Sequence, residues 1–190
     1  MKTSTTLNAV HADIEQVLLG RDRIAARIVE LGDAITQDLE ALDEEAEIVL
    51  VAIMSGAVIF LADLIRQLPQ KLRIEVVTVT SYPGKSTESR GPQIHGELAA
   101  QYDGRHVVIV DDILDSGGTL KLMRAEIQRR NPLTLRSCVL LRKQRPSAMA
   151  VPCEYVGFDI PDVFVVGYGL DYDNYYRNLP DIGCLKERAL

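Results

Sequence analysis

The fold is decided by the stretch Val107-Val108-Ile109-Val110-Asp111-Asp112-Ile113-Leu114-Asp115-Ser116-Gly117-Gly118-Thr119. Its apolar first part predicts a buried strand, and Asp111 and Asp112 stand at the carboxyl end of that strand. In open α/β sheets, ligands bind outside the carboxyl ends of the strands. A turn with two glycines follows and leads into a predicted helix, and successive backbone N–H groups in such a turn can bind phosphate. The stretch therefore predicts an α/β fold with an anion site at the carboxyl edge of its sheet.

A phosphate-binding turn next to two acids suits a ligand that carries both a phosphate and a vicinal diol. Carboxylates accept hydrogen bonds from hydroxyl groups, so the pattern describes a ribose 5-phosphate. The sequence has no GxxxxGKS or GxxxxGKT motif and no GxGxxG motif after a strand. It therefore lacks the marks of a Walker-type triphosphate site and of a dinucleotide-binding fold.

The segments around this stretch alternate between apolar runs typical of buried strands and patterns typical of helices. We expect helices at Leu7–Leu19, Ile24–Leu39, Ala57–Leu68 and Gly118–Arg130, and a loop at Ser81–Gln93. We expect strands at Ile48–Met54, Leu72–Thr80, His106–Val110 and Leu135–Leu141, with short ones near Tyr155–Phe158 and Phe164–Val166. This order predicts an α/β fold with a mostly parallel central sheet flanked by helices.

Length and composition fit one soluble globular domain of 190 residues, with 47% hydrophobic and 25% charged residues. The net charge of −6 argues against a nucleic-acid binder. The charges are unevenly spread, because Glu30–Glu47 holds eight acids and Lys121–Arg145 holds eight bases and one acid. Two interpretations stay open: two solvated faces, or a basic segment near a polyanionic ligand or a subunit contact.

The sequence gives no sign of secretion, membrane insertion or a histidine metal site. The three cysteines show no CxxC spacing, which argues against a disulfide framework. The apolar stretch Ile48–Ala62 is too short to span a bilayer, and Met1–Val10 lacks an apolar signal core. The histidines are scattered at His11, His95 and His106. We expect a cytoplasmic protein.

The acidic turn resembles the signature of the type I phosphoribosyltransferases. The C-terminal part narrows the resemblance with Val156-Gly157-Phe158-Asp159-Ile160-Pro161-Asp162, Phe164-Val165-Val166-Gly167-Tyr168-Gly169-Leu170-Asp171-Tyr172 and Tyr176-Arg177-Asn178-Leu179-Pro180. From about Leu7 to the C-terminus, the chain is similar to the hypoxanthine-guanine phosphoribosyltransferase family. The resemblance implies one phosphoribosyltransferase domain over residues 1–190. It also implies a mobile lid at about 81–94 and a hood from the N-terminus and about 150–190.

The resemblance also implies an activity in purine salvage. A 5-phosphoribosyl group would pass from phosphoribosyl pyrophosphate to N9 of hypoxanthine or guanine, with Mg²⁺ as cofactor, giving IMP or GMP and pyrophosphate. A homodimer or homotetramer is expected. Two alternatives stay open: a xanthine-preferring enzyme, and a regulator of the same fold that senses phosphoribosyl pyrophosphate or a nucleotide without catalysis.

Residue by residue, the resemblance assigns the ribosyl substrate to three groups. Asp111 and Asp112 match the acids on the ribose hydroxyls, and the 5-phosphate loop is matched by Ser116, Gly117, Gly118 and Thr119. Pyrophosphate is assigned to Ser55, Gly56 and Arg177, in a loop that in this family typically contains a non-proline cis peptide. The family often has Lys or Arg where Ser55 stands and a longer residue where Gly118 stands.

The remaining matches concern the base, the lid and the metal. Asp115 matches the catalytic carboxylic residue that faces N7 of the base, a candidate general base or acid, and Lys143 matches the lysine that donates to O6. The base-binding set is Lys143, Phe164, Val165 and Asp171, the lid begins at Ser81 and Tyr82, and Mg²⁺ is assigned to Asp171, Asp111 and Asp112.

Overall fold

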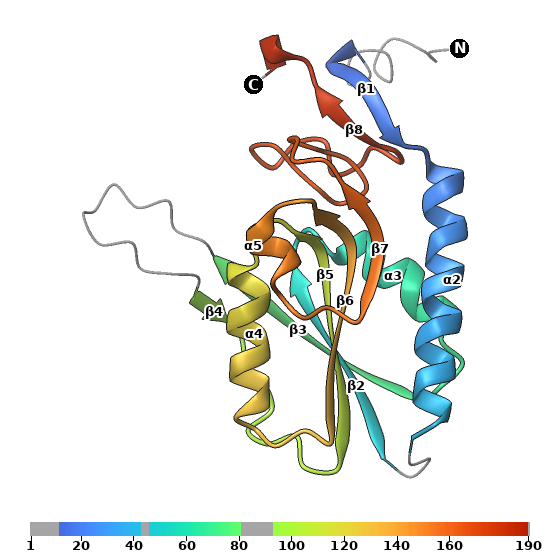
Figure 1. Cartoon of the computed structure of the whole chain (residues 1–190), viewed down its shortest axis with the longest axis vertical. Helices are drawn as coiled ribbons and strands as arrows, with labels where there is room; N and C mark the ends of the chain where they lie inside the picture. Colours follow the sequence, from blue (N-terminus) through green and yellow to red (C-terminus); the bar gives the residue numbers. More distant parts are fainter. Residues whose placement is uncertain (1–11, 43–45, 81–92, 190) are drawn as a thin grey trace, which may run out of the picture.

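A six-stranded sheet forms the centre of the computed structural model, which describes residues 12–42, 46–80 and 93–189 (Figure 1). The strand order is β4-β3-β2-β5-β6-β7, and every neighbouring pair is parallel except β3 and β4. The strands are β2 Glu47–Met54, β3 Leu72–Thr80, β4 Gln93–His95, β5 Arg105–Leu114, β6 Thr134–Lys143 and β7 Tyr155–Ile160. The mostly parallel sheet expected from the sequence is confirmed.

Helices cover both faces of this sheet. On one face lie α2 (Arg21–Glu40) and α3 (Val58–Leu64), the latter continued by a 3₁₀ turn at Ile65–Gln67. On the other face lie α4 (Gly118–Gln128) and the short α5 (Pro146–Met149). The apolar stripe predicted for α2 is buried at Ile24, Ile28, Leu31, Ile35 and Leu39. Because successive strand residues point to opposite faces, β2 contributes Leu50 to one core and Val49 to the other.

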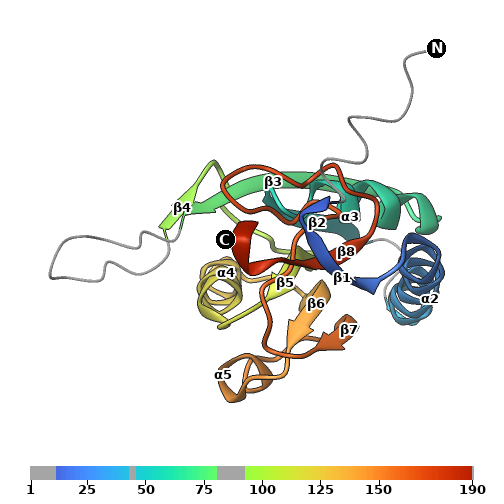
Figure 2. The same cartoon turned by 90° about the horizontal axis from the view of Figure 1, so that it is seen from above.

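A two-stranded antiparallel sheet joins the two ends of the described chain. Its strands are β1 (Ile14–Leu19) and β8 (Ile182–Leu185), and a 3₁₀ turn at Glu187–Ala189 follows. Seen from above, β1 and β8 lie across the carboxyl ends of the parallel strands (Figure 2). The helix expected at Leu7–Leu19 is therefore wrong for residues 14–19, whereas residues 7–11 lie outside the described part. A partner far along the chain decides the conformation of β1, and local spacing does not reveal it.

Other boundaries differ from the sequence-based expectation in ways that matter for the site. Strand β5 continues through the acid pair to Leu114, and β6 includes Lys143 as its last residue. Residues 164–166 form no strand, and only Val166 makes an isolated bridge, to Gly183. Gln93 begins β4 instead of ending a loop, and α5 was not expected.

No helix in the described ranges is long and apolar enough to cross a membrane.

Candidate active site

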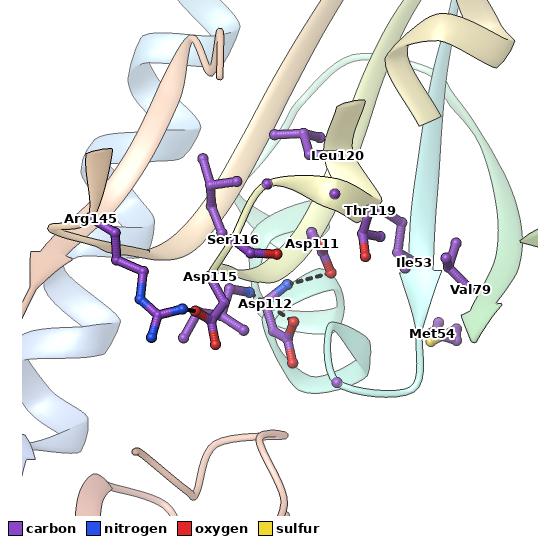
Figure 3. Close-up of a pocket in the computed structure, with 15 residues that line it drawn as sticks. Ile53, Met54, Val79, Asp111, Asp112, Asp115, Ser116, Thr119, Leu120 and Arg145 are labelled. Atoms are coloured by element: carbon purple, nitrogen blue, oxygen red, sulfur yellow. Dashed lines mark hydrogen bonds and ion pairs between the residues drawn. The ribbon is translucent and has the colours of Figure 1, made fainter. Parts of the chain in front are cut away.

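A cavity of about 510 Å³ opens at the carboxyl ends of β2 and β5 (Figure 3). Most of its lining comes from the stretch that decides the fold. Seven of the predicted site residues lie together here on that stretch: Asp111, Asp112, Asp115, Ser116, Gly117, Gly118 and Thr119. Gly56 joins them from the loop after β2, and Arg145, which the sequence did not single out, joins them from the start of α5.

The acid pair is held by the backbone of β5. Asp111 is 7% exposed and accepts a hydrogen bond from the backbone N–H of Asp112 at 3.0 Å. Asp112 in turn accepts one from the N–H of Ile113 at 2.7 Å. Burial raises the pKa of Asp111 well above its usual range, and the charge of Asp112 raises it further. Burial also raises the pKa of Asp112. A cation or hydroxyl donors placed here would offset the cost of a buried carboxylate next to a half-buried one.

The loop after β2 approaches the acid pair closely. The Met54–Ser55 peptide is cis, which confirms the non-proline cis bond expected for this loop. A Cβ atom at Gly56 would lie 1.7 Å from Oδ2 of Asp112. On its other side, a Cβ at Gly169, whose φ is +98°, would lie 2.2 Å from the carbonyl oxygen of Gly56. Two glycines therefore allow the acid pair, this loop and the segment after β7 to pack in direct contact.

The turn between β5 and α4 has the shape of an anion site. Gly117 adopts a left-handed conformation with φ of +89° at the N-cap of α4, and Ser116 and Gly118 are exposed. The first N–H groups of a helix have no acceptor within the helix, and the helix dipole favours an anion near them. Helix α5 and the residues after it pack against the turn, because a Cβ at Gly117 would come within 2.4 Å of Val151 and 3.3 Å of the Ser147 carbonyl oxygen.

A ring of four charges borders the cavity at its Asp115 side. Asp115 binds Lys143 Nζ through Oδ2 at 3.0 Å and an Arg145 nitrogen through Oδ1 at 2.6 Å. Asp162 contacts the same two cations, at 3.6 Å for Lys143 and 2.7 Å for Arg145. The hydrogen bond from Arg145 lowers the pKa of Asp162. Lys143 is 6% exposed, so its charge is buried but compensated by both carboxylates.

The segment after β7 carries the other predicted residues outside the cavity lining. Arg177 bridges Asp171 at 2.8 Å and the carbonyl oxygen of Gly169 at 2.7 Å. Phe164 is 46% exposed and meets the ring of Tyr172 edge-on, with centroids 5.6 Å apart.

Two further predicted residues, Val165 and Ser55, also lie apart from the cavity lining. The Val165 side chain is buried in the core, and Ser55 is exposed on its loop. Ser81 and Tyr82, predicted to begin the lid, lie outside the described residues.

Comparisons with known proteins agree on one family. Residues 20–173 match the family described as "Phosphoribosyl transferase domain". The chain is 45% identical over 180 residues to the hypoxanthine-guanine phosphoribosyltransferase of Mycobacterium tuberculosis (strain ATCC 25618 / H37Rv), covering 93% of this chain and 89% of that protein. The chain belongs to the hypoxanthine-guanine phosphoribosyltransferase family. The hypoxanthine phosphoribosyltransferase of Escherichia coli (strain K12) is 40% identical over 168 residues, covering 88% of this chain and 93% of that protein.

Solved structures of the hypoxanthine-guanine phosphoribosyltransferase family also share the fold of this chain. A crystal structure of a hypoxanthine phosphoribosyltransferase from Staphylococcus aureus superposes with a TM-score of 0.86 at 38% identity, covering 97% of this chain and 98% of that chain. The type I phosphoribosyltransferase fold expected from the resemblance is thereby confirmed.

Proposed function

We propose that this chain catalyses Mg²⁺-dependent transfer of a 5-phosphoribosyl group from phosphoribosyl pyrophosphate to N9 of hypoxanthine or guanine. The observation that carries the proposal is the contact between Asp115 and Lys143, whose Oδ2 and Nζ atoms are 3.0 Å apart at the edge of the cavity. This arrangement presents an acceptor and a donor side by side. They complement the N7–H and the 6-oxo group on one edge of a 6-oxopurine.

The same pair supports selectivity against adenine. An ammonium group has only donors to offer, and adenine carries an amino group where hypoxanthine and guanine carry an oxygen. Lys143 would keep its carboxylate partners, but the amino group of adenine facing it in so enclosed a site would find no acceptor there. A buried polar group left without a partner costs about 1–3 kcal/mol.

The ribosyl substrate takes the other half of the cavity. The 5-phosphate lies on the turn from Ser116 to Thr119 at the start of α4, and the ribose hydroxyls donate to the carboxylates of Asp111 and Asp112. Gly56 and the exposed Ser55 offer backbone N–H groups to pyrophosphate. Arg177 becomes available to pyrophosphate if it releases Asp171, its partner at 2.8 Å.

The residues fit Mg²⁺, which prefers oxygen ligands and retains several waters. In the described part of the chain, neither Asp111 nor Asp112 forms an ion pair with Lys or Arg. Burial raises the pKa of both, and the charge of Arg177 acts in the opposite direction on the pKa of Asp112. Asp111 and Asp112 would hold the metal with substrate oxygens, and Asp171, which forms no three-acid cluster with them among the described residues, would contribute as a separate ligand. Bound Mg²⁺ supplies electrostatic stabilisation of the departing pyrophosphate.

The reaction is a displacement at C1′ with dissociative character. The C1′–O bond to pyrophosphate breaks and its electron pair leaves with pyrophosphate, while the lone pair of N9 forms the new C1′–N9 bond. Asp115 accepts the proton from N7 as positive charge develops on the purine. Arg177 stabilises the leaving group, and the binding of both substrates in one cavity supplies the orientation.

The basic segment gives little support to a nucleic-acid-binding regulator. Arg124 binds Glu154, Arg142 binds Asp159, and Arg136 reaches Asp38 of the acidic segment at 3.3 Å. The two oppositely charged segments therefore meet within one chain. Cations that already have carboxylate partners attract a polyanion less strongly.

The test is to incubate the protein with phosphoribosyl pyrophosphate, Mg²⁺ and one base at a time: hypoxanthine, guanine, xanthine, adenine or uracil. Nucleotide formed from hypoxanthine or guanine, and not from adenine or uracil, supports the proposal. A marked preference for xanthine would show that xanthine, and not hypoxanthine or guanine, is the substrate. Absence of product with every base, while phosphoribosyl pyrophosphate still binds, would favour the sensing regulator.

A further inference from the structure

Arg145 occupies a position in the cavity that the assigned roles leave unexplained. Its guanidinium places one nitrogen 2.6 Å from Asp115 and the other terminal nitrogen 2.7 Å from Asp162. Figure 3 shows the Arg145 side chain reaching along the cavity edge to the carboxylate of Asp115. The planar fork of an arginine suits this bridge, because its donors point in fixed directions.

The Asp115 carboxylate needs such a restraint. Its side chain is 46% exposed and stands in a turn, so water competes for both of its oxygens. Lys143 alone holds only Oδ2, and in the proposed reaction Lys143 must also donate to the 6-oxo group of the base. Arg145 holds the opposite oxygen, Oδ1, and thereby fixes the carboxylate without occupying the oxygen that faces Lys143.

The backbone under Arg145 is itself fixed. Arg145 is the N-cap of α5 and has an extended conformation, which the following Pro146 favours. Its N–H donates to the Lys143 carbonyl oxygen at 2.8 Å, and its carbonyl oxygen accepts from Met149 at 2.9 Å. The guanidinium therefore extends from a backbone position that is held by hydrogen bonds. This position lies two residues after Lys143, the last residue of β6.

We propose that Arg145 is a positioning residue that holds Asp115 by Oδ1, so that the carboxylate faces N7 of the purine while Lys143 binds O6. Asp162 supports this role by binding both cations from the segment after β7, which keeps the ring of two acids and two bases electrically neutral. The inference rests on the proposed function, because it assigns Arg145 a task in that reaction.

The test compares steady-state kinetics of Arg145→Gln, Arg145→Lys and Arg145→Ala with the wild type. We expect Arg145→Gln to lower kcat with hypoxanthine by about 10- to 100-fold, within the contribution of a positioned general acid or base. The KM for phosphoribosyl pyrophosphate should stay unchanged. Arg145→Lys should recover part of kcat, and free guanidinium at low concentration should raise kcat of Arg145→Ala specifically.

The matched control is Arg142→Gln. Arg142 of β6 binds Asp159 of the neighbouring strand β7 through two nitrogens at 2.6 and 3.0 Å, but it does not line the cavity. Its replacement removes a comparable ion pair and should leave kcat at the wild-type value.

Two results would overturn the inference while leaving the proposed function intact. One is wild-type kcat in Arg145→Gln. The other is a lower melting temperature in Arg145→Gln with unchanged kcat per folded molecule, which would make the role structural only. If the wild type forms no nucleotide from any purine, the proposed function fails first and the inference fails with it.

Discussion

The carboxylate of Asp112 occupies the space in which a side chain at position 56 would begin. A Cβ at Gly56 would lie 1.7 Å from Oδ2 of Asp112, far inside the contact distance of the two atoms. The loop after β2 can therefore pack against the acid pair of β5 only because position 56 carries no Cβ atom. In the proposed reaction, these two parts bind pyrophosphate and ribose of the same substrate.

Replacement of Gly56 by alanine should weaken binding of phosphoribosyl pyrophosphate. Either the loop or Asp112 must move, and such overpacking typically costs about 1–3 kcal/mol. Calorimetric titration with phosphoribosyl pyrophosphate and Mg²⁺ measures the effect. Gly20→Ala is the control, because a Cβ there meets no atom within 4 Å. Equal affinity of Gly56→Ala and the wild type would mean that the contact between the loop and the acid pair is unimportant for binding.

Asp112→Asn should change affinity and stability in opposite directions. The amide keeps the size of the carboxylate but removes the charge of a half-buried group whose pKa is raised by burial, so the ligand-free protein should melt at a higher temperature. The affinity for phosphoribosyl pyrophosphate should fall by about 1.5–3 kcal/mol, as for a hydrogen bond to a charged group. Thermal melts measure the stability and calorimetry measures the affinity. The exposed Asp33→Asn is the control, because it removes one negative charge away from the cavity. Unchanged affinity would remove Asp112 from the ribose site.

Asp115→Asn should lower turnover much more than substrate binding. An amide has the size of the carboxylate but cannot take up the N7 proton, so kcat should fall by roughly 10²–10⁴-fold. The KM for phosphoribosyl pyrophosphate should remain close to that of the wild type. Asp103→Asn, at an exposed turn before β5, serves as the control. Wild-type kcat in Asp115→Asn would contradict the role of Asp115 as the group that accepts the N7 proton.

Lys143→Ala should reduce the preference for 6-oxopurines over adenine. Removing the ammonium leaves O6 without its donor and removes the clash of donors with adenine, each an effect of about 1–3 kcal/mol. The ratio of kcat/KM for hypoxanthine and adenine measures this directly. Lys71→Ala is the control, because Lys71 is exposed at the opposite end of β3 from the cavity. A ratio that stays constant in Lys143→Ala would show that another group selects the base.

The acidic stretch and the strand–helix alternation were sufficient to predict the central sheet and the cavity at its edge. These features depend on local patterns: buried apolar runs for β2 and β5, and a stripe from Ile24 to Leu39 for α2. Strand β1 could not be found in this way, because its outward residues are exposed and its partner β8 lies at the other end of the chain. The cis peptide followed from the family resemblance alone.

Arg145 was missed for a related reason. Its role depends on three segments meeting: the turn after β5, the end of β6 and the segment after β7. In the sequence alone, the arginine is one member of the basic run Lys121–Arg145. The available signal was its position two residues after Lys143 and directly before Pro146, which fixes its backbone at the mouth of the site. The metal, the lid and the homo-oligomer stay predictions.

The most direct test is to identify the products formed from hypoxanthine, phosphoribosyl pyrophosphate and Mg²⁺ by mass spectrometry, with pyrophosphate measured in parallel. The account predicts IMP and pyrophosphate in equal amounts, and no nucleotide when adenine replaces hypoxanthine. Pyrophosphate released without IMP, or AMP formed as readily as IMP, would contradict it.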